Sequence, residues 1–146
     1  MKTPLLAKIS RVLIYLTALV PLIIFAQYIS PFHFGKAIVF RSIIELLVVV
    51  YGMLVITDRS YAPRMHGLTW AILAFTAAFG IATATSVVPW ASFWGSLERM
   101  GGFFSFLHFT AFVLIVPAVL RERAHWTFFL NLLIALQLFL ICEIRN

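Results

Sequence analysis

Four charged side chains in a mostly apolar sequence have the types and spacing that could do chemistry. Arg41 and Glu45 are four residues apart inside a long hydrophobic run. Glu98 and Arg99 are adjacent in the segment 87–102, which also carries two tryptophans and a glycine pair. Arginine binds phosphate and carboxylate groups through paired N–H donors, and a carboxylate accepts hydrogen bonds or a proton. These four residues are therefore the candidate substrate-binding residues, and they indicate an anionic ligand.

The composition indicates an integral membrane protein and excludes a soluble globular domain. Hydrophobic residues make up 63% of the chain and charged residues 11%, and the mean hydropathy is +1.05, so polar side chains are too few to cover a soluble core. The single cysteine, Cys142, excludes an internal disulfide and a cysteine-based metal cluster. The net charge of +6 does not indicate a nucleic-acid partner, because the basic residues are scattered between apolar runs. The expected partner is the lipid bilayer.

Five apolar runs are long enough to cross a hydrocarbon core roughly 30 Å thick. The sequence therefore predicts a single-domain, all-α, polytopic transmembrane helix bundle of about five spans. The expected spans are residues 9–27, 37–57, 67–85, 102–120 and 127–144. The third span has alanines at four-residue spacing, Ala74, Ala78 and Ala82, and such small residues let helices approach closely. We therefore expect the third span to lie inside the bundle.

The basic residues predict the orientation, because cytoplasmic loops carry an excess of lysine and arginine. An N-terminus inside puts seven of the eleven basic residues on the cytoplasmic side, namely Lys2, Lys8, Arg11, Arg59, Arg64, Arg121 and Arg123. The segment 87–102 is then external, and an odd number of spans leaves the C-terminus external as well. We expect the chain to be an N-terminal fragment of a larger polytopic protein.

Arg41 and Glu45 share one helical face because they are four residues apart. At a rise of about 1.5 Å per residue, Arg41 lies about one turn inside the membrane and can extend outward, whereas Glu45 lies about two turns inside. A charge near the bilayer centre costs on the order of 3 kcal/mol, so both side chains are expected to face the bundle interior or a water-filled cavity. Two interpretations stay open, an ion pair that only locks helix packing and a binding site for an anionic ligand.

Glu98 and Arg99 stand just before the expected fourth helix, where Gly101 and Gly102 permit close backbone approach. Free amides at that helix N-terminus, together with Arg99, are able to receive phosphate oxygens. The alternative is an interfacial loop that is anchored by its two tryptophans, with both charges solvated.

The four histidines do not predict a cofactor. A bis-histidine haem needs two histidines at matching depth on facing helices, and only His108 lies within an expected span. The sequence also has no phosphate-cradling glycine loop and no His-x-x-x-His metal spacing. Neither a cofactor nor a metal is therefore expected.

Two stretches of the sequence resemble a known family. The segment 92–108, SFWGSLERMGGFFSFLH, is similar to the external loop and following helix of the bacterial O-antigen ligase and O-antigen polymerase-like membrane proteins. The segment 35–41, GKAIVFR, with Glu45 following, resembles their second helix. The resemblance extends over roughly residues 12–140 and is most specific in the segment 92–108.

The resemblance implies a metal-independent glycosyltransferase of lipopolysaccharide biosynthesis in the cell envelope. Such proteins move a glycan from an undecaprenyl diphosphate carrier to a lipid or sugar acceptor on the external face of the bacterial inner membrane. Members of the family have more spans and a large external loop that holds the arginines and the histidine of the transfer reaction. No catalytic residue can therefore be assigned in this chain, which alone is expected to be inactive. Its four candidate residues would shape the wall of the carrier or acceptor cavity.

A second hypothesis is a small non-enzymatic helical membrane subunit or assembly factor that works by contact with a larger partner. The alanine face of the third span, with Asn131 and Gln137 of the fifth, would then face the partner. A transporter half is disfavoured because the spans show no visible inverted repetition.

In the full-length protein, Arg99→Ala is expected to lower glycan transfer without changing membrane insertion, because a cation that stabilises the departing diphosphate is lost. The glycan ladder on a gel measures transfer. An unchanged ladder would assign Arg99 a structural role.

Overall fold

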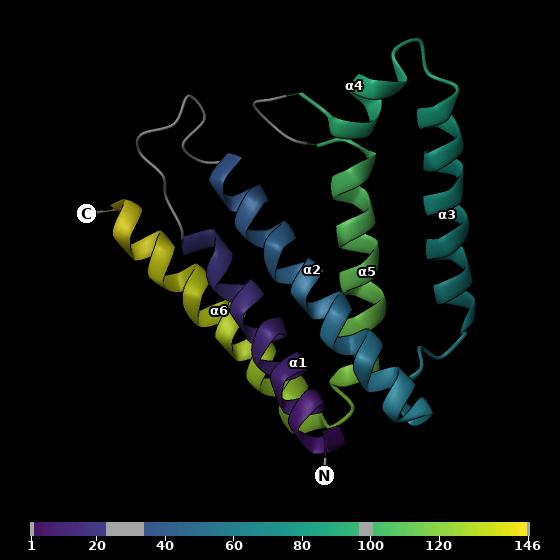
Figure 1. Cartoon of the computed structure of the whole chain (residues 1–146). Coiled ribbons are helices and arrows are strands. Elements are labelled where there is room, and N and C mark those ends of the chain that lie inside the picture. The colour runs from purple at the N-terminus through teal and green to yellow at the C-terminus, as the bar shows by residue number, and fades with distance from the viewer. Residues whose placement is uncertain (1, 23–33, 97–100, 146) are drawn as a thin grey trace.

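The computed structural model describes residues 2–22, 34–96 and 101–145, and these residues form helices and connecting segments (Figure 1). The five long helices are α1 (Lys2–Leu19), α2 (Phe34–Thr57), α3 (Gly67–Ala84), α5 (Phe103–Val119) and α6 (Arg123–Arg145). The short elements are the 3₁₀ turns η1 (Val20–Leu22) and η2 (Arg59–Tyr61) and the helix α4 (Pro89–Trp94).

The predicted all-helical membrane bundle is confirmed. Among the described residues, four helical stretches are long and apolar enough to cross a bilayer, namely Thr3–Leu22, Gly35–Thr57, Gly67–Ala84 and Arg123–Cys142. The fifth apolar helix, α5, has 17 residues, which is the lower limit for a transmembrane helix. The chain is therefore a multi-pass membrane protein, and α5 is the shortest of its five long helices among the described residues.

The first helix differs most from its expected bounds. It begins at Lys2, not at residue 9, because Pro4 lies in the first turn, where a missing N–H breaks no helical hydrogen bond. At the other end the α-helix stops at Leu19 and continues as η1. Pro21 cannot donate to the carbonyl of Thr17, so the regular α-helical pattern cannot pass it. The remainder of the expected span, residues 23–27, lies outside the described residues.

Helix α5 is the centre of the bundle, with α2 and α1 on one side and α3 on the other (Figure 1). Apolar side chains of α1, α2, α5 and α6 form one core, with the fully buried Ile14, Ile44 and Leu47 at its centre. α2 and α5 run in the same direction (Figure 1), so the order of the contacts is the same along both helices: Arg41 meets Ser105, and Glu45 meets His108. This parallel arrangement brings polar residues of the first half of α2 next to polar residues of the first half of α5.

The prediction that the third span lies inside the bundle is wrong. Helix α3 stands at the edge, and the alanine face of Ala74, Ala78 and Ala82 is exposed. The face that meets α5 holds Thr76, whose hydroxyl is 3.1 Å from that of Thr110, and Phe79, whose ring packs edge-on against Phe103 and Phe106 of α5. Interlocking aromatic rings bury more surface than a row of methyl groups, which explains why α3 packs on α5 through the face of Phe79 and not through its alanine face.

A hydrogen bond between α1 and α6 joins the two ends of the chain. Arg11 Nη1 lies 2.6 Å from His125 Nε2. Because a guanidinium only donates, His125 Nε2 accepts, and the ring proton is on Nδ1, which is 3.3 Å from the hydroxyl oxygen of Tyr15. His125 thus links Arg11 and Tyr15 of α1 to the start of α6.

The described basic connections gather at one end of the bundle. The start of α1, the connection 58–66 and the turn between α5 and α6 lie together there (Figure 1). This agrees with the grouping that the sequence predicts. Which side of the membrane that end faces stays a prediction.

Leu47→Ala is expected to lower the free energy of unfolding in detergent by about 2 kcal/mol. This is the low end for a buried leucine, because detergent also covers the apolar groups of the unfolded chain. Leu46→Ala is the matched control, since Leu46 is 58% exposed whereas Leu47 is fully buried, and its effect should stay within about 0.5 kcal/mol. If thermal unfolding gave the same loss of free energy of unfolding for both variants, that result would contradict this packing.

Candidate functional site

The polar side chains at the contact between α2 and α5 form the candidate site. We define the α2–α5 polar cluster as Arg41 and Glu45 on α2 with Ser105 and His108 on α5. Arg41 contacts Ser105, and Glu45, one turn further along α2, contacts His108, one turn further along α5. The predicted common face of Arg41 and Glu45 is thus directed at α5.

Arg41 is held against the first turn of α5. Its Nη2 donates to the hydroxyl oxygen of Ser105, and its Cζ lies 5.2 Å from the centroid of the Phe104 ring. A guanidinium over an aromatic face is attracted by the negative potential of the ring. Both contacts orient the cation toward the start of α5.

The proton positions of His108 follow from its two neighbours. Nδ1 is 2.7 Å from the carbonyl oxygen of Phe104, and because a carbonyl only accepts, Nδ1 carries a hydrogen. Nε2 lies 3.3 Å from Glu45 Oε1. A hydrogen bond there requires one proton between the two groups, either as imidazolium with carboxylate or as neutral imidazole with carboxylic acid. The pair therefore holds one exchangeable proton, which is the chemistry of a general acid or base.

The two members of this pair differ in exposure. The His108 side chain is 9% exposed, whereas that of Glu45 is 61% exposed. Glu45 lies eleven residues after Phe34, about 17 Å along a helix about 36 Å long, which is near its midpoint. A carboxyl group at that depth is costly against hydrocarbon, so its outer side requires water or further protein.

The two other predicted site residues, Glu98 and Arg99, lie outside the described residues. Next to them, α4 packs directly on the start of α5. A Cβ atom on Gly102 would overlap the backbone of Trp94 and Gly95, so the expected close backbone approach is confirmed at Gly102. A Cβ atom on Gly101 would meet no other atom, although the backbone of Gly101 lies close to Gly95.

The helix α4 was not expected within the segment 87–102. The signals for it were present, since Pro89 is at the first helical position and Gly95, with φ of 78°, ends the helix. Ser92 Oγ also donates to Ser86 Oγ at 2.9 Å, which ties α4 to the end of α3. The two tryptophans, Trp90 and Trp94, pack edge-on against each other on this helix.

The pairing of His108 with Glu45 is not among the predictions from the sequence, where His108 is considered only as a haem ligand. The available signal was that ionisable groups inside a membrane pair with one another, and these two residues occupy separate spans. Within the described residues, histidine, cysteine and carboxylate side chains do not gather in groups of three, so no metal centre is assigned there.

A double-mutant cycle with Glu45→Gln and His108→Gln is expected to give a coupling energy of about 0.5–3 kcal/mol in thermal unfolding, because the two side chains share a hydrogen bond. The control cycle combines Glu45→Gln with Thr76→Val, whose hydroxyl contacts Thr110 on a different face of α5. Its coupling energy should be close to zero. Equal coupling in both cycles would show that the first does not report a direct contact.

The chain matches no protein family, curated protein or solved structure in comparisons with known proteins. The chemistry of the site therefore rests on its residues and their geometry. The resemblance to the O-antigen ligases stays a prediction from the two stretches that carry it.

Proposed function

We propose that this chain is the N-terminal transmembrane part of an O-antigen ligase-like glycosyltransferase of the bacterial inner membrane. The protein would transfer a glycan from an undecaprenyl diphosphate carrier to a lipid or sugar acceptor on the external face. In that reaction a bond forms between the acceptor oxygen and the anomeric carbon, and the bond from that carbon to the diphosphate breaks. A base takes the proton of the acceptor hydroxyl, and cations stabilise the departing diphosphate.

One observation carries the proposal. The two stretches on which the resemblance rests, the segments 35–45 and 92–108, are about fifty residues apart in sequence but contact each other in the structure. Arg41 of the first stretch bonds to Ser105 of the second, and Glu45 bonds to His108. Shared family positions that meet in space form a single site more readily than positions that are scattered over a fold.

The residues of the α2–α5 polar cluster have the chemistry for a wall of the carrier cavity. The guanidinium of Arg41 suits phosphate oxygens, and aromatic rings of Phe93, Trp94 and Phe104 pack together beside it. Such rings suit an isoprenoid chain or the apolar face of a sugar. The exposed side of Glu45 would be covered by water or by further helices of the same protein.

In the full-length protein, Arg41→Ala is expected to reduce the amount of transferred glycan by about tenfold, because a cation of the site is lost. Arg41→Lys, which keeps the charge without the fork of donors, should retain part of the activity. Arg123→Ala, at the opposite end of the bundle, is the control. A glycan ladder on a gel measures transfer, and an immunoblot of the membranes measures insertion. Equal ladders for Arg41→Ala and the control would refute a role for Arg41 in transfer.

A second candidate function is a small helical membrane subunit that acts by contact with a larger partner. The observation in its favour is the exposed alanine face of α3, together with the exposed amides of Asn131 and Gln137 on α6. Small residues and amides on lipid-facing surfaces are typical of helix–helix contacts in membranes. Reading the coding DNA beyond the codon for Asn146 separates the two functions. Further spans with a large external loop favour the transferase, and an immediate stop codon favours the subunit.

A further inference from the structure

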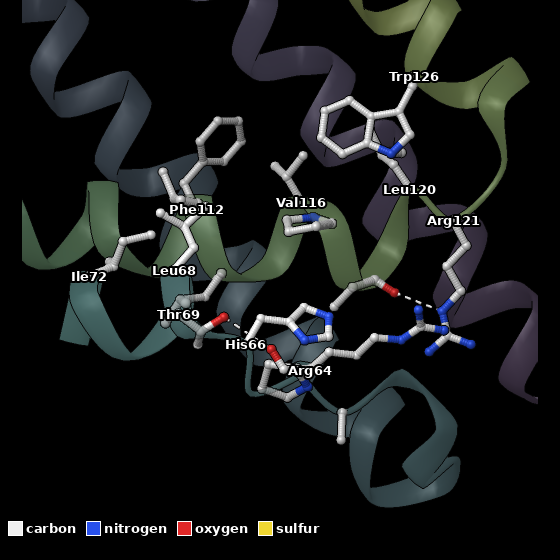
Figure 2. Close-up of a pocket in the computed structure, with 16 residues that line it drawn as sticks. Arg64, His66, Leu68, Thr69, Ile72, Phe112, Val116, Leu120, Arg121 and Trp126 are labelled. Atoms are coloured by element: carbon white, nitrogen blue, oxygen red, sulfur yellow. Dashed lines mark hydrogen bonds between the residues drawn. The ribbon is translucent and has the colours of Figure 1, made fainter.

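A cavity of about 620 Å³ lies at the end of the bundle opposite α4 (Figure 2). Its walls come from three parts of the chain: the connection 62–66 with the start of α3, the last two turns of α5, and the turn that leads into α6. Neither Arg41 nor Glu45 lines it. The volume is within the range of roughly 300–1,000 Å³ that small-molecule sites have. This cavity is therefore separate from the α2–α5 polar cluster.

One end of the cavity is basic. Figure 2 shows the guanidinium groups of Arg64 and Arg121 at the same end, with the His66 ring beside them. Arg121 is held in place, because its Nε donates to the carbonyl of Ala118 at 3.1 Å, its Nη2 donates to the carbonyl of Ser60, and its Cζ lies 4.1 Å from the centroid of the Tyr61 ring. Two cations at one end, one of them fixed, favour an anionic ligand.

Arg64 has no hydrogen-bond or ion-pair partner for its guanidinium within the part of the chain that the structure describes. It is exposed and directed along the cavity toward Arg121 (Figure 2). An arginine that the protein itself does not use keeps its five donors available for a ligand.

Acidic groups near this end do not cancel the basic ones. Among the residues that the structure describes, no aspartate or glutamate lines the cavity. Asp58 lies nearby, where hydrogen bonds from Ser60 hold the pKa of its carboxyl below the ordinary value and Arg121 adds to that effect. Glu122 lies on the side of His125, at 3.7 Å from its Nε2. Against these two acids, the connections at this end carry Arg59, Arg64, Arg121 and Arg123.

The other end of the cavity is apolar. The other labelled lining residues are mostly apolar: Leu68 and Ile72 come from α3, Phe112 and Val116 from α5, and Trp126 from α6 (Figure 2). From Leu120 back to Phe112 the cavity follows α5 for eight residues, about 12 Å toward the centre of the membrane. A ligand that fills both ends must therefore carry an anion at one end and a hydrocarbon chain at the other.

We propose that this cavity is a binding site for an anionic phospholipid of the leaflet that this end of the bundle faces. The headgroup phosphate lies between Arg64 and Arg121, and one acyl chain extends along α5 between Phe112 and the first turns of α3. A zwitterionic lipid fits less well, because its ammonium group would lie among arginines with no carboxylate in the lining. A free phosphate ion would leave the apolar walls without a partner. This proposal goes beyond the glycan transfer that we propose for the other end of the bundle and does not depend on it.

The test uses the full-length protein in phosphatidylcholine vesicles that contain a minority of phosphatidylglycerol. A photoactivatable phosphatidylglycerol, with its reactive group on an acyl chain, is expected to label peptides from the last turns of α5 and the first turn of α3 more than the matched phosphatidylcholine probe. Arg64→Gln should reduce that preference about fivefold, which corresponds to about 1 kcal/mol per basic residue at an anionic surface. Arg59→Gln removes an exposed arginine of the neighbouring η2 turn that does not line the cavity, and it should leave the preference unchanged.

Arg64 is the residue to substitute, because Arg121 also donates to the backbone of the connection between α2 and α3. Loss of the Arg121 side chain would therefore disturb the fold. As a second measurement, native mass spectrometry should find phosphatidylglycerol retained by the wild type and by Arg59→Gln but lost from Arg64→Gln. Equal labelling by both probes, or a preference that survives Arg64→Gln, would overturn the proposal. Displacement of the lipid by inorganic phosphate at equal concentration would assign the site to a free anion and would overturn it as well.

Discussion

The hydrocarbon core of a membrane supplies no hydrogen-bond partner, and the arrangement of this chain follows from that constraint. Apolar packing between helices gains little in lipid, because lipid tails are as apolar as leucine side chains. Polar side chains within the spans must instead find one another. Among the described residues, such contacts between different helices include Arg11 and Tyr15 with His125, Arg41 with Ser105, Glu45 with His108, and Thr76 with Thr110. The last three involve α5, which accounts for its central position.

The position of α5 also connects the two proposals. Its first turns meet Arg41 and Glu45 and receive the close backbone contact of α4, whereas its last turns line the cavity with the basic end. A helix that is packed on both sides holds each set of residues in a fixed geometry. The same short helix thus separates a proton-bearing polar cluster from a lipid-sized cavity at the other end of the bundle.

Much of the fold was predictable because the bilayer imposes a length and a composition on each span. The helices α3 and α5 begin and end within one residue of the expected spans, and the shared face of Arg41 and Glu45 follows from helical periodicity alone. The position of α3 was not predictable from its alanine face. A face of small residues permits close approach, but it does not say whether a neighbour is present, and the aromatic face around Phe79 met α5 instead.

The sequence by itself determined the class of protein, the number of long apolar helices in the described part of the chain and the candidate residues of α2. These depend on local composition and on the regular repeat of the α-helix, and both can be taken from the sequence alone. Only the tertiary structure decided that His108 faces Glu45, that Ser105 receives Arg41, and that Arg64 and Arg121 meet at one cavity. The physical reason is that these contacts depend on which helices are neighbours, on their direction and on their axial offset. Periodicity within one helix contains none of that information.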